Sequence, residues 1–210
     1  MTTETTLLGL ELPLGSPPQI RRTPTGAVEL PVDSDTADRF CAKCAPFSDD
    51  RGHLWWLGAI DGRNADRSGG YGRFQAGRGD LAVITTAHRF AWTIEHGPVP
   101  QGLVVRHRCD EPLCAAIDHL ELGTSADNNW DALERPLRAA DLDIRGSAGR
   151  SRAIRDAVLA VLAHGSVDSV ALGEAVRAAM ALGDPDRFQL RLWPDDDISP
   201  AIGSQTGDTG

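Results

Sequence analysis

The pattern of apolar and polar positions divides the chain into regions of different order. Residues 1–38 show no sustained period and are rich in Thr, Pro, Gly and acidic residues, so we expect an extended or disordered arm. Beyond this arm, short apolar runs bounded by turn residues predict strands, and apolar residues at helical spacing predict helices. The predicted strands cover 53–60, 71–77, 102–107 and 120–122, and the predicted helices cover 85–97 and 124–135.

Residues with capping preferences stand at the ends of these predicted helices. Thr86 and Gly97 fit the start and the stop of the first helix. Thr124, with Asp127 three residues later, is typical of a capping box at the start of the second. Together these elements predict a small α+β domain over residues 39–136.

The C-terminal third of the chain has a helical pattern. After a polar joint at 141–149, apolar residues recur at helical spacing in 151–165 and again in 169–183, which predicts a helical hairpin. We therefore expect a helical accessory segment over 137–194. The remaining residues, 195–210, are acidic and rich in Gly and Ser, which is typical of a disordered tail.

The charge of the chain limits how it could bind nucleic acid. A formal net charge of -9 argues against a protein that coats nucleic acid through overall basicity, because the field of the whole chain would repel phosphate. Residues 51–108 depart from this balance, with eight arginines against four acidic residues. Any nucleic-acid binding must therefore be local.

The reactive side chains concentrate in the predicted α+β domain, which holds all four cysteines and five of the six histidines. The apolar run near the start is short and is interrupted by Glu11, so the sequence shows no secretory signal or transmembrane segment. We expect a cytoplasmic location. Cysteines there are reduced thiols, which favours metal ligation over disulfides.

Cys109, Cys114 and His119 form a candidate zinc site. They are separated by five residues each time, and closely spaced ligand pairs let a short loop wrap the ion. Zinc takes four ligands in a tetrahedron, so one corner remains open. His53, Cys41 or Cys44 could close it, and a closed site would be structural.

Two further residues in the same region are candidates for catalysis. His107 ends a predicted strand, and we expect it to lie outside the zinc site, where its imidazole is free to act as a base. Asn128 lies on the first turn of the following helix, where its carbonyl oxygen can face a hard cation such as magnesium.

These residues, in this order, resemble the HNH endonuclease superfamily with its ββα-metal fold. The similarity runs from about Phe40 to Arg135 and includes "GAIDG", "GYGRF", "AHRFAW", "GPVPQGLVVRH", "PLC", "DHLELGT" and "ADN". It is strongest toward the branch that includes the His-Cys box homing endonucleases and phage-type HNH nucleases. The resemblance implies a small zinc-stabilised ββα-metal domain that hydrolyses DNA phosphodiester bonds, by nicking or by double-strand cleavage.

The resemblance also implies a role for each matching residue. His107 would be the general base, Asn128 a ligand of the catalytic magnesium or another divalent cation, and Cys109, Cys114 and His119 ligands of a structural zinc ion. Relatives place the fourth zinc ligand, a cysteine, just before the "GAIDG" segment. This chain has His53 there, so the register favours His53 over Cys41 or Cys44. The competing interpretation is a catalytically silent zinc module that binds DNA or a protein.

Contacts with partners are predicted at two places. The candidate phosphate contacts are Arg73, Arg78, Arg89, Arg106 and Arg108. The peptide "QLRLW" at 189–193 is similar to the short peptide that docks on the polymerase sliding clamp, with Gln189, Leu192 and Trp193 as its contact residues. DNA is thus the expected substrate, and the sliding clamp or a second copy of the chain is a candidate partner.

Overall fold

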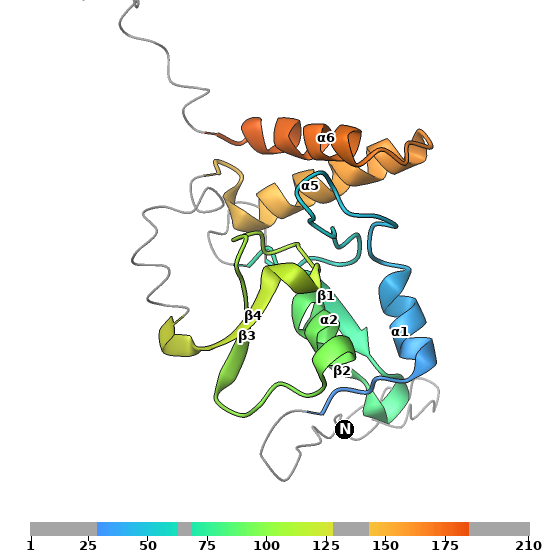
Figure 1. The fold of residues 1–210 in the computed structure, drawn as a ribbon, viewed down its shortest axis with the longest axis vertical. Coiled ribbons are helices and arrows are strands. Elements are labelled where there is room, and N and C mark those ends of the chain that lie inside the picture. Colours follow the sequence, from blue (N-terminus) through green and yellow to red (C-terminus); the bar gives the residue numbers. More distant parts are fainter. Residues whose placement is uncertain (1–28, 63–68, 128–142, 185–210) are drawn as a thin grey trace, which may run out of the picture.

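The computed structural model describes residues 29–62, 69–127 and 143–184 and shows an α+β protein, as expected (Figure 1). Its α-helices are α1 (Ser34–Cys41), α2 (Ala87–His96), α5 (Gly146–Ala163) and α6 (Ser169–Ala181). Its strands are β1 (Arg73–Ala76), β2 (Val83–Thr86), β3 (Leu103–His107) and β4 (Leu120–Thr124). Short 3-10 turns, η1 (Gly79–Leu81) and η2 (Ile117–His119), precede β2 and β4.

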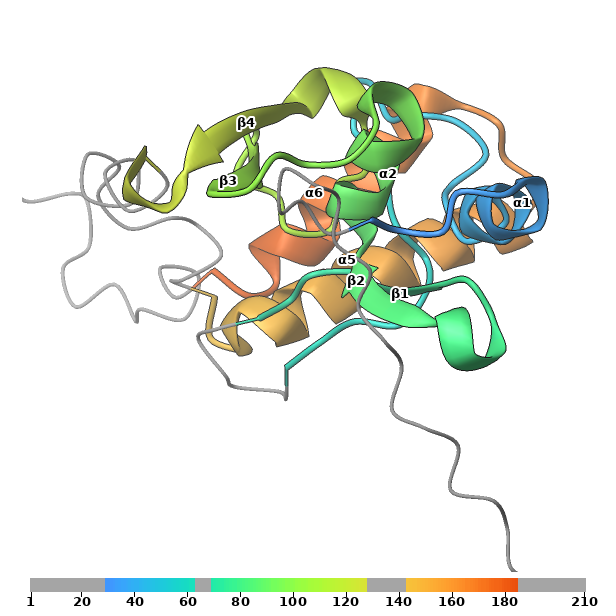
Figure 2. The same cartoon turned by 90° about the horizontal axis from the view of Figure 1, so that it is seen from below.

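The strands form two separate antiparallel hairpins. In the first, β1 pairs with β2 so that Arg73 lies opposite Thr86. In the second, β3 pairs with β4 so that His107 lies opposite Leu120. Helix α2 connects the two hairpins and contacts both of them (Figure 2). This arrangement brings the ends of β1 and β3 to the same helix.

A cluster of aromatic side chains holds the first hairpin, α1 and α2 together. Trp56 and Phe90 are fully buried, and the ring of Phe40 lies 5.2 Å from that of Trp56 and 5.1 Å from that of Phe90. Phe74 of β1 completes the cluster, with its ring 4.6 Å from that of Phe90. Aromatic pairs at such separations contribute beyond the area that they bury. The cluster fixes the first hairpin against both helices.

Two expectations for the first half of the domain were wrong. The extended arm was expected to reach residue 38, whereas α1 begins at Ser34, capped by the Asp33 carboxylate, and Leu30 is already buried. The strand expected at 53–60 is instead a chain segment with isolated bridges, of which Trp55 opposite Cys114 is one. The regular partner of β1 is β2, whose last two residues fall within the helix predicted over 85–97.

Several other elements form as expected. Helix α2 has Thr86 at its N-cap and ends at Gly97, whose φ of 81° lies in the left-handed region that glycine tolerates. At the end of β4, the Asp127 backbone N–H donates to Thr124 Oγ1 while the Thr124 backbone N–H donates to the Asp127 carboxylate. The predicted capping box is therefore present, and a helix begins after β4.

The predicted helical hairpin is also present and packs against the domain. Figure 1 shows α5 and α6 side by side across one end of it, and α5 begins at Gly146, within the expected polar joint. Arg150 of α5 forms an ion pair of 2.6 Å with Glu111, and both side chains are largely buried. Arg177 of α6 pairs with Asp50 at 2.9 Å. Within the described residues, no helix is long and apolar enough to span a membrane.

The buried ion pair between Arg150 and Glu111 predicts that the stability of the domain depends on its contact with the C-terminal hairpin. Replacing one partner of a buried ion pair costs about 3 to 5 kcal/mol, because the other charge stays buried without compensation. We therefore expect Arg150→Ala to lower the free energy of unfolding by about 3 kcal/mol in a denaturant titration.

Arg155→Ala is the matched control for this prediction. Arg155 lies on the same helix, but its partner Asp156 is 64% exposed, and exposed pairs contribute about 0 to 1 kcal/mol. Equal losses in the two variants would show that the pair between Arg150 and Glu111 does not attach the hairpin.

Candidate metal centre and active site

His53, Cys109 and His119 come together from separate parts of the chain. One potential ligand atom from each lies within 4.8 Å of the other two. His53 precedes the buried Trp55, Cys109 follows β3, and His119 ends the turn before β4. Cys114 adjoins them, with its sulfur 3.5 Å from His119 Nδ1. The four residues are called the Cys-His cluster below.

The spacing and chemistry of this cluster fit a tetrahedral metal ion. With zinc–sulfur and zinc–nitrogen distances of about 2.3 and 2.05 Å, tetrahedral geometry puts a sulfur and a nitrogen about 3.6 Å apart. The 3.5 Å between Cys114 Sγ and His119 Nδ1 agrees with this separation. Two thiols and two imidazoles are a common ligand set for zinc. His53, Cys109 and His119 could therefore hold a metal ion together, and Cys114 is the candidate fourth ligand because its sulfur adjoins His119.

Asp49 orients the imidazole of His53. The Nδ1 atom of His53 lies 3.1 Å from both carboxylate oxygens of Asp49. The indole of Trp55 donates to the same carboxylate at 3.0 Å, as do the backbone N–H groups of Arg51 and His53 at 3.0 and 2.9 Å. Because Nδ1 donates to Asp49, Nε2 is the nitrogen left for the cluster, as in other metal sites where a carboxylate fixes the histidine tautomer.

The two thiols of the cluster differ in how readily they lose a proton. The pKa of Cys109 is lowered to about 3, first because Cys114 donates a hydrogen bond to its sulfur, and further because His53 does so. The pKa of Cys114 is raised because its proton is shared with the Cys109 thiolate and because it is buried. Burial alone would lower the pKa of His53, but the Cys109 thiolate and Asp49 raise it. These surroundings favour the thiolate form of Cys109, which is the form that binds metals.

The two alternative ligands lie elsewhere. Cys41 is exposed at the end of α1. Cys44 is half-buried and pairs through its backbone with Trp56, and burial raises the pKa of its thiol to about 12. Among the described residues, neither belongs to the group of ligand atoms that His53 joins.

His107 lies beside the cluster, at the end of β3. Its Nε2 atom is 2.9 Å from the carbonyl oxygen of Cys114. A carbonyl only accepts, so Nε2 carries the proton and Nδ1 keeps its lone pair. Burial lowers the pKa of His107. The imidazole is therefore neutral at physiological pH, with Nδ1 available as a base.

Two residues that sequence reasoning did not single out pack against His107. The ring of His88, on the first turn of α2, lies 4.5 Å from that of His107 in an edge-on arrangement. The ring of Tyr71, just before β1, stacks 6.2 Å away. Burial, followed by the neighbouring His107, holds the pKa of His88 well below its usual value. Nothing in the spacing of these residues along the chain indicates that they meet.

The five candidate phosphate contacts have different surroundings. Arg78 is held by Asp35 through two hydrogen bonds of 2.9 Å, and Arg106 pairs with Glu121 at 3.0 Å. Arg89 is half-buried, and burial lowers its pKa. Arg73 and Arg108 are exposed.

Four other predicted site residues lie outside the described residues, so their roles stay predictions: Asn128, Gln189, Leu192 and Trp193.

The comparisons with known proteins point to one family. Residues 85–130, which include His107, Cys109, Cys114 and His119, match the model of the HNH endonuclease family. Protein 7.7 of Escherichia phage T7 is 37% identical over 84 residues, which make up 40% of this chain and 57% of that protein. The chain thus spans little more than half the length of this relative. No solved structure matches the present chain significantly.

The matching segment contains both His107 and three members of the Cys-His cluster. The expected resemblance to HNH endonucleases is therefore confirmed for this segment, and it indicates a nuclease.

The composition of the cluster predicts which variants lose metal. We expect His53→Ala to lose stoichiometric zinc and to unfold at a lower temperature, because a metal that binds only the folded state stabilises it. Metal content by atomic spectroscopy and thermal unfolding would test this. Cys41→Ser and Cys44→Ser are the controls and should keep the metal. Zinc lost from Cys44→Ser and retained in His53→Ala would assign the fourth corner to Cys44.

The role of Asp49 can be tested without removing a ligand. Asp49→Asn keeps an acceptor for Trp55 but removes the charge that holds His53, and changes at such supporting residues weaken metal binding about 10- to 100-fold. Competition with a chelator should show a loss of that size. Asp38→Asn, which neutralises an exposed carboxylate on α1, should leave the affinity unchanged. Equal affinities for all three proteins would mean that Asp49 supports only the fold.

Proposed function

We propose that the protein is a metal-dependent DNA endonuclease of the HNH type, with His107 as its general base. The single observation that carries this proposal is the hydrogen bond of 2.9 Å between His107 Nε2 and the carbonyl oxygen of Cys114. It leaves Nδ1 unprotonated beside a cluster that fits a metal, within the segment that matches the HNH family.

The residues around His107 suit the hydrolysis of a phosphodiester. Nδ1 takes a proton from the attacking water, and a lowered pKa keeps it free to do so at physiological pH. The Cys114 carbonyl accepts from Nε2–H and stabilises the imidazolium that forms. The rings of His88 and Tyr71 limit the tilt of the imidazole, which must be held to within about half an ångström of the productive geometry.

Two metal ions with different roles complete the proposal. His53, Cys109, Cys114 and His119 would hold a structural zinc ion, which ties the loop that carries the Cys114 carbonyl to the rest of the domain. The resemblance assigns a magnesium or other divalent ion to Asn128. When bound, that ion supplies a Lewis acid for the charge that develops on the phosphate and on the leaving 3′ oxygen.

The test is a comparison of plasmid cleavage by three proteins in the presence of magnesium. Wild type should nick or linearise the plasmid, and His107→Ala should be slower by about 100-fold or more, since general-base catalysis contributes about 10² to 10⁴. Asn128→Ala should show a comparable loss. Undiminished cleavage by His107→Ala would exclude His107 as the base.

Two controls separate loss of chemistry from loss of structure. His107→Ala should keep the metal content of wild type, because the imidazole is not a member of the Cys-His cluster. His96→Ala replaces another histidine of the matching segment, at the end of α2, and should leave cleavage unchanged. If wild type bound DNA but did not cleave it with any divalent metal, the silent zinc module would be the better description.

A further inference from the structure

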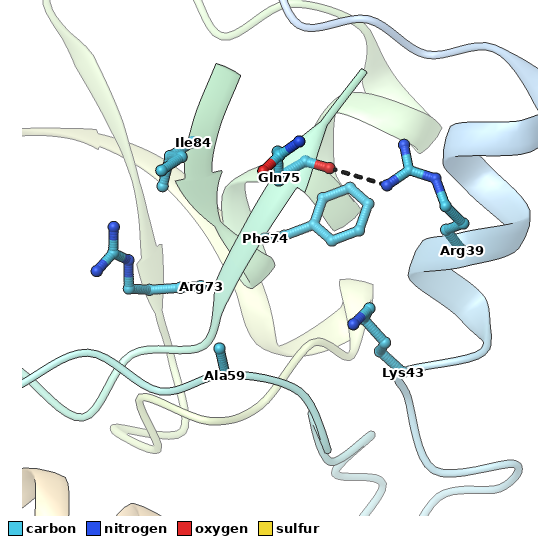
Figure 3. A pocket seen from close by; sticks show the side chains of 7 residues that line it. All are labelled: Arg39, Lys43, Ala59, Arg73, Phe74, Gln75 and Ile84. Carbon is cyan, nitrogen blue, oxygen red and sulfur yellow. Dashed lines mark hydrogen bonds between the residues drawn. The ribbon is translucent and has the colours of Figure 1, made fainter. Parts of the chain in front are cut away.

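A groove on the first hairpin has features of a site for phosphate groups. It has a volume of about 390 Å³ and runs over the outer face of β1, between α1 and β2 (Figure 3). Phe74 lies in its floor, and Gln75 and the exposed Ile84 lie along it. Its three charged lining residues, Arg39, Lys43 and Arg73, are all basic.

The three cations of this groove are in different states. Arg39 forms an ion pair of 3.1 Å with Asp35, and it donates to the backbone carbonyls of Gln75 and Gly77 at 3.2 Å each. Arg39 is therefore already bonded within the protein and lines the side of the groove. Lys43 and Arg73 are exposed and form no ion pair or side-chain hydrogen bond with the residues that the structure describes. Two cations are thus available to a ligand.

Unpaired cations are unexpected here because the chain is acidic. With a net charge of -9, carboxylates are in excess, and beside the groove Asp35 pairs with both Arg39 and Arg78. Figure 3 shows Arg73 and Lys43 on opposite sides of β1, with no acidic side chain among the lining residues. An anion that passes over the strand could contact both cations, since phosphate affinity comes mainly from such neutralisation.

Two short series of neighbouring residues lead from the groove to His107. Arg73 lies two residues after Tyr71, whose ring stacks against His107. Residues two apart in an extended chain point to the same side. Arg73 also lies opposite Thr86, whose hydroxyl is 3.2 Å from Nε2 of His88, and His88 packs against His107. A strand cleaved at His107 can therefore continue over Arg73 toward Lys43.

We propose that this groove, with Lys43 and Arg73 as its contacts, binds the phosphate backbone of the DNA that extends from the cleavage site. The proposal rests on the proposed nuclease function, and it assigns to the substrate a surface outside the segment that matches the HNH family. Both proposed contacts are cations that would meet phosphate rather than base edges. The groove would therefore bind without regard to sequence.

The salt dependence of DNA binding tests this proposal independently of cleavage. A labelled DNA duplex of arbitrary sequence is titrated against the zinc-loaded His107→Ala protein at several salt concentrations, without magnesium. The double variant Lys43→Gln with Arg73→Gln should bind more weakly. Its slope of log affinity against log salt should be shallower by about 1.8, because each lost phosphate contact removes about 0.9 from the slope.

The matched control removes the same two charges at arginines that already have partners. Arg155→Gln with Arg177→Gln acts on the helical hairpin, away from the groove, where each guanidinium group is paired with its own carboxylate, Asp156 or Asp50. This variant should keep the slope of the parent protein. In the active protein, the groove variant should raise KM and leave kcat nearly unchanged, as expected for binding remote from the chemistry.

Two results would overturn the proposal that the groove binds DNA. One is a salt slope for the groove variant equal to that of the control variant. The other is a shallower slope that is seen with duplex RNA but not with duplex DNA. Failure of the wild type to cleave would not affect the binding result. If the groove variant kept the slope of its parent and wild type cleaved normally, the groove would not be a DNA-binding site, and the proposed nuclease function would still stand.

Discussion

The hydrogen bond between His107 and the Cys114 carbonyl couples the two parts of the candidate site. Cys114 contributes its sulfur to the Cys-His cluster and its carbonyl oxygen to His107, and the latter contact measures 2.9 Å. The tautomer of His107 therefore depends on the conformation of the loop between Cys109 and Cys114. That loop has little regular structure of its own, so the residues that hold it determine how well the imidazole of His107 is oriented.

Three sets of contacts hold this loop in place. Cys109 and Cys114 join it to His53 and His119, and Trp55 pairs through its backbone with Cys114. Glu111 attaches the loop to Arg150 of α5. The C-terminal hairpin is thus not a separate appendage, because its buried arginine reaches the same five-residue interval that carries the ligands. A small domain built on two two-stranded hairpins has a limited core, and these contacts add to its stability.

The sequence predicted the elements with strong local signals. Thr86 and Gly97 bounded α2, Thr124 and Asp127 marked the capping box, and apolar periodicity predicted α5 and α6. It failed at the bridges of 53–60, where pairing involves residues far along the chain, and at β2, whose last residues were assigned to the helix that follows directly. Tyr71 and His88 were missed because only the fold brings them to His107. Asp49 is four residues from His53, but it lies in a segment without regular structure, so no periodic pattern indicated their contact.

The acidic charge of the chain and its proposed substrate are compatible because the arginines are used in two ways. Arg39, Arg78, Arg106, Arg150 and Arg177 are paired with carboxylates and hold segments of the protein together. Such pairs contribute little field outside the molecule. A few unpaired cations, such as Lys43 and Arg73, would then determine where a polyanion approaches. Repulsion by the rest of an acidic surface would disfavour other approaches, so on the proposed function net charge and local binding would together orient the DNA toward His107.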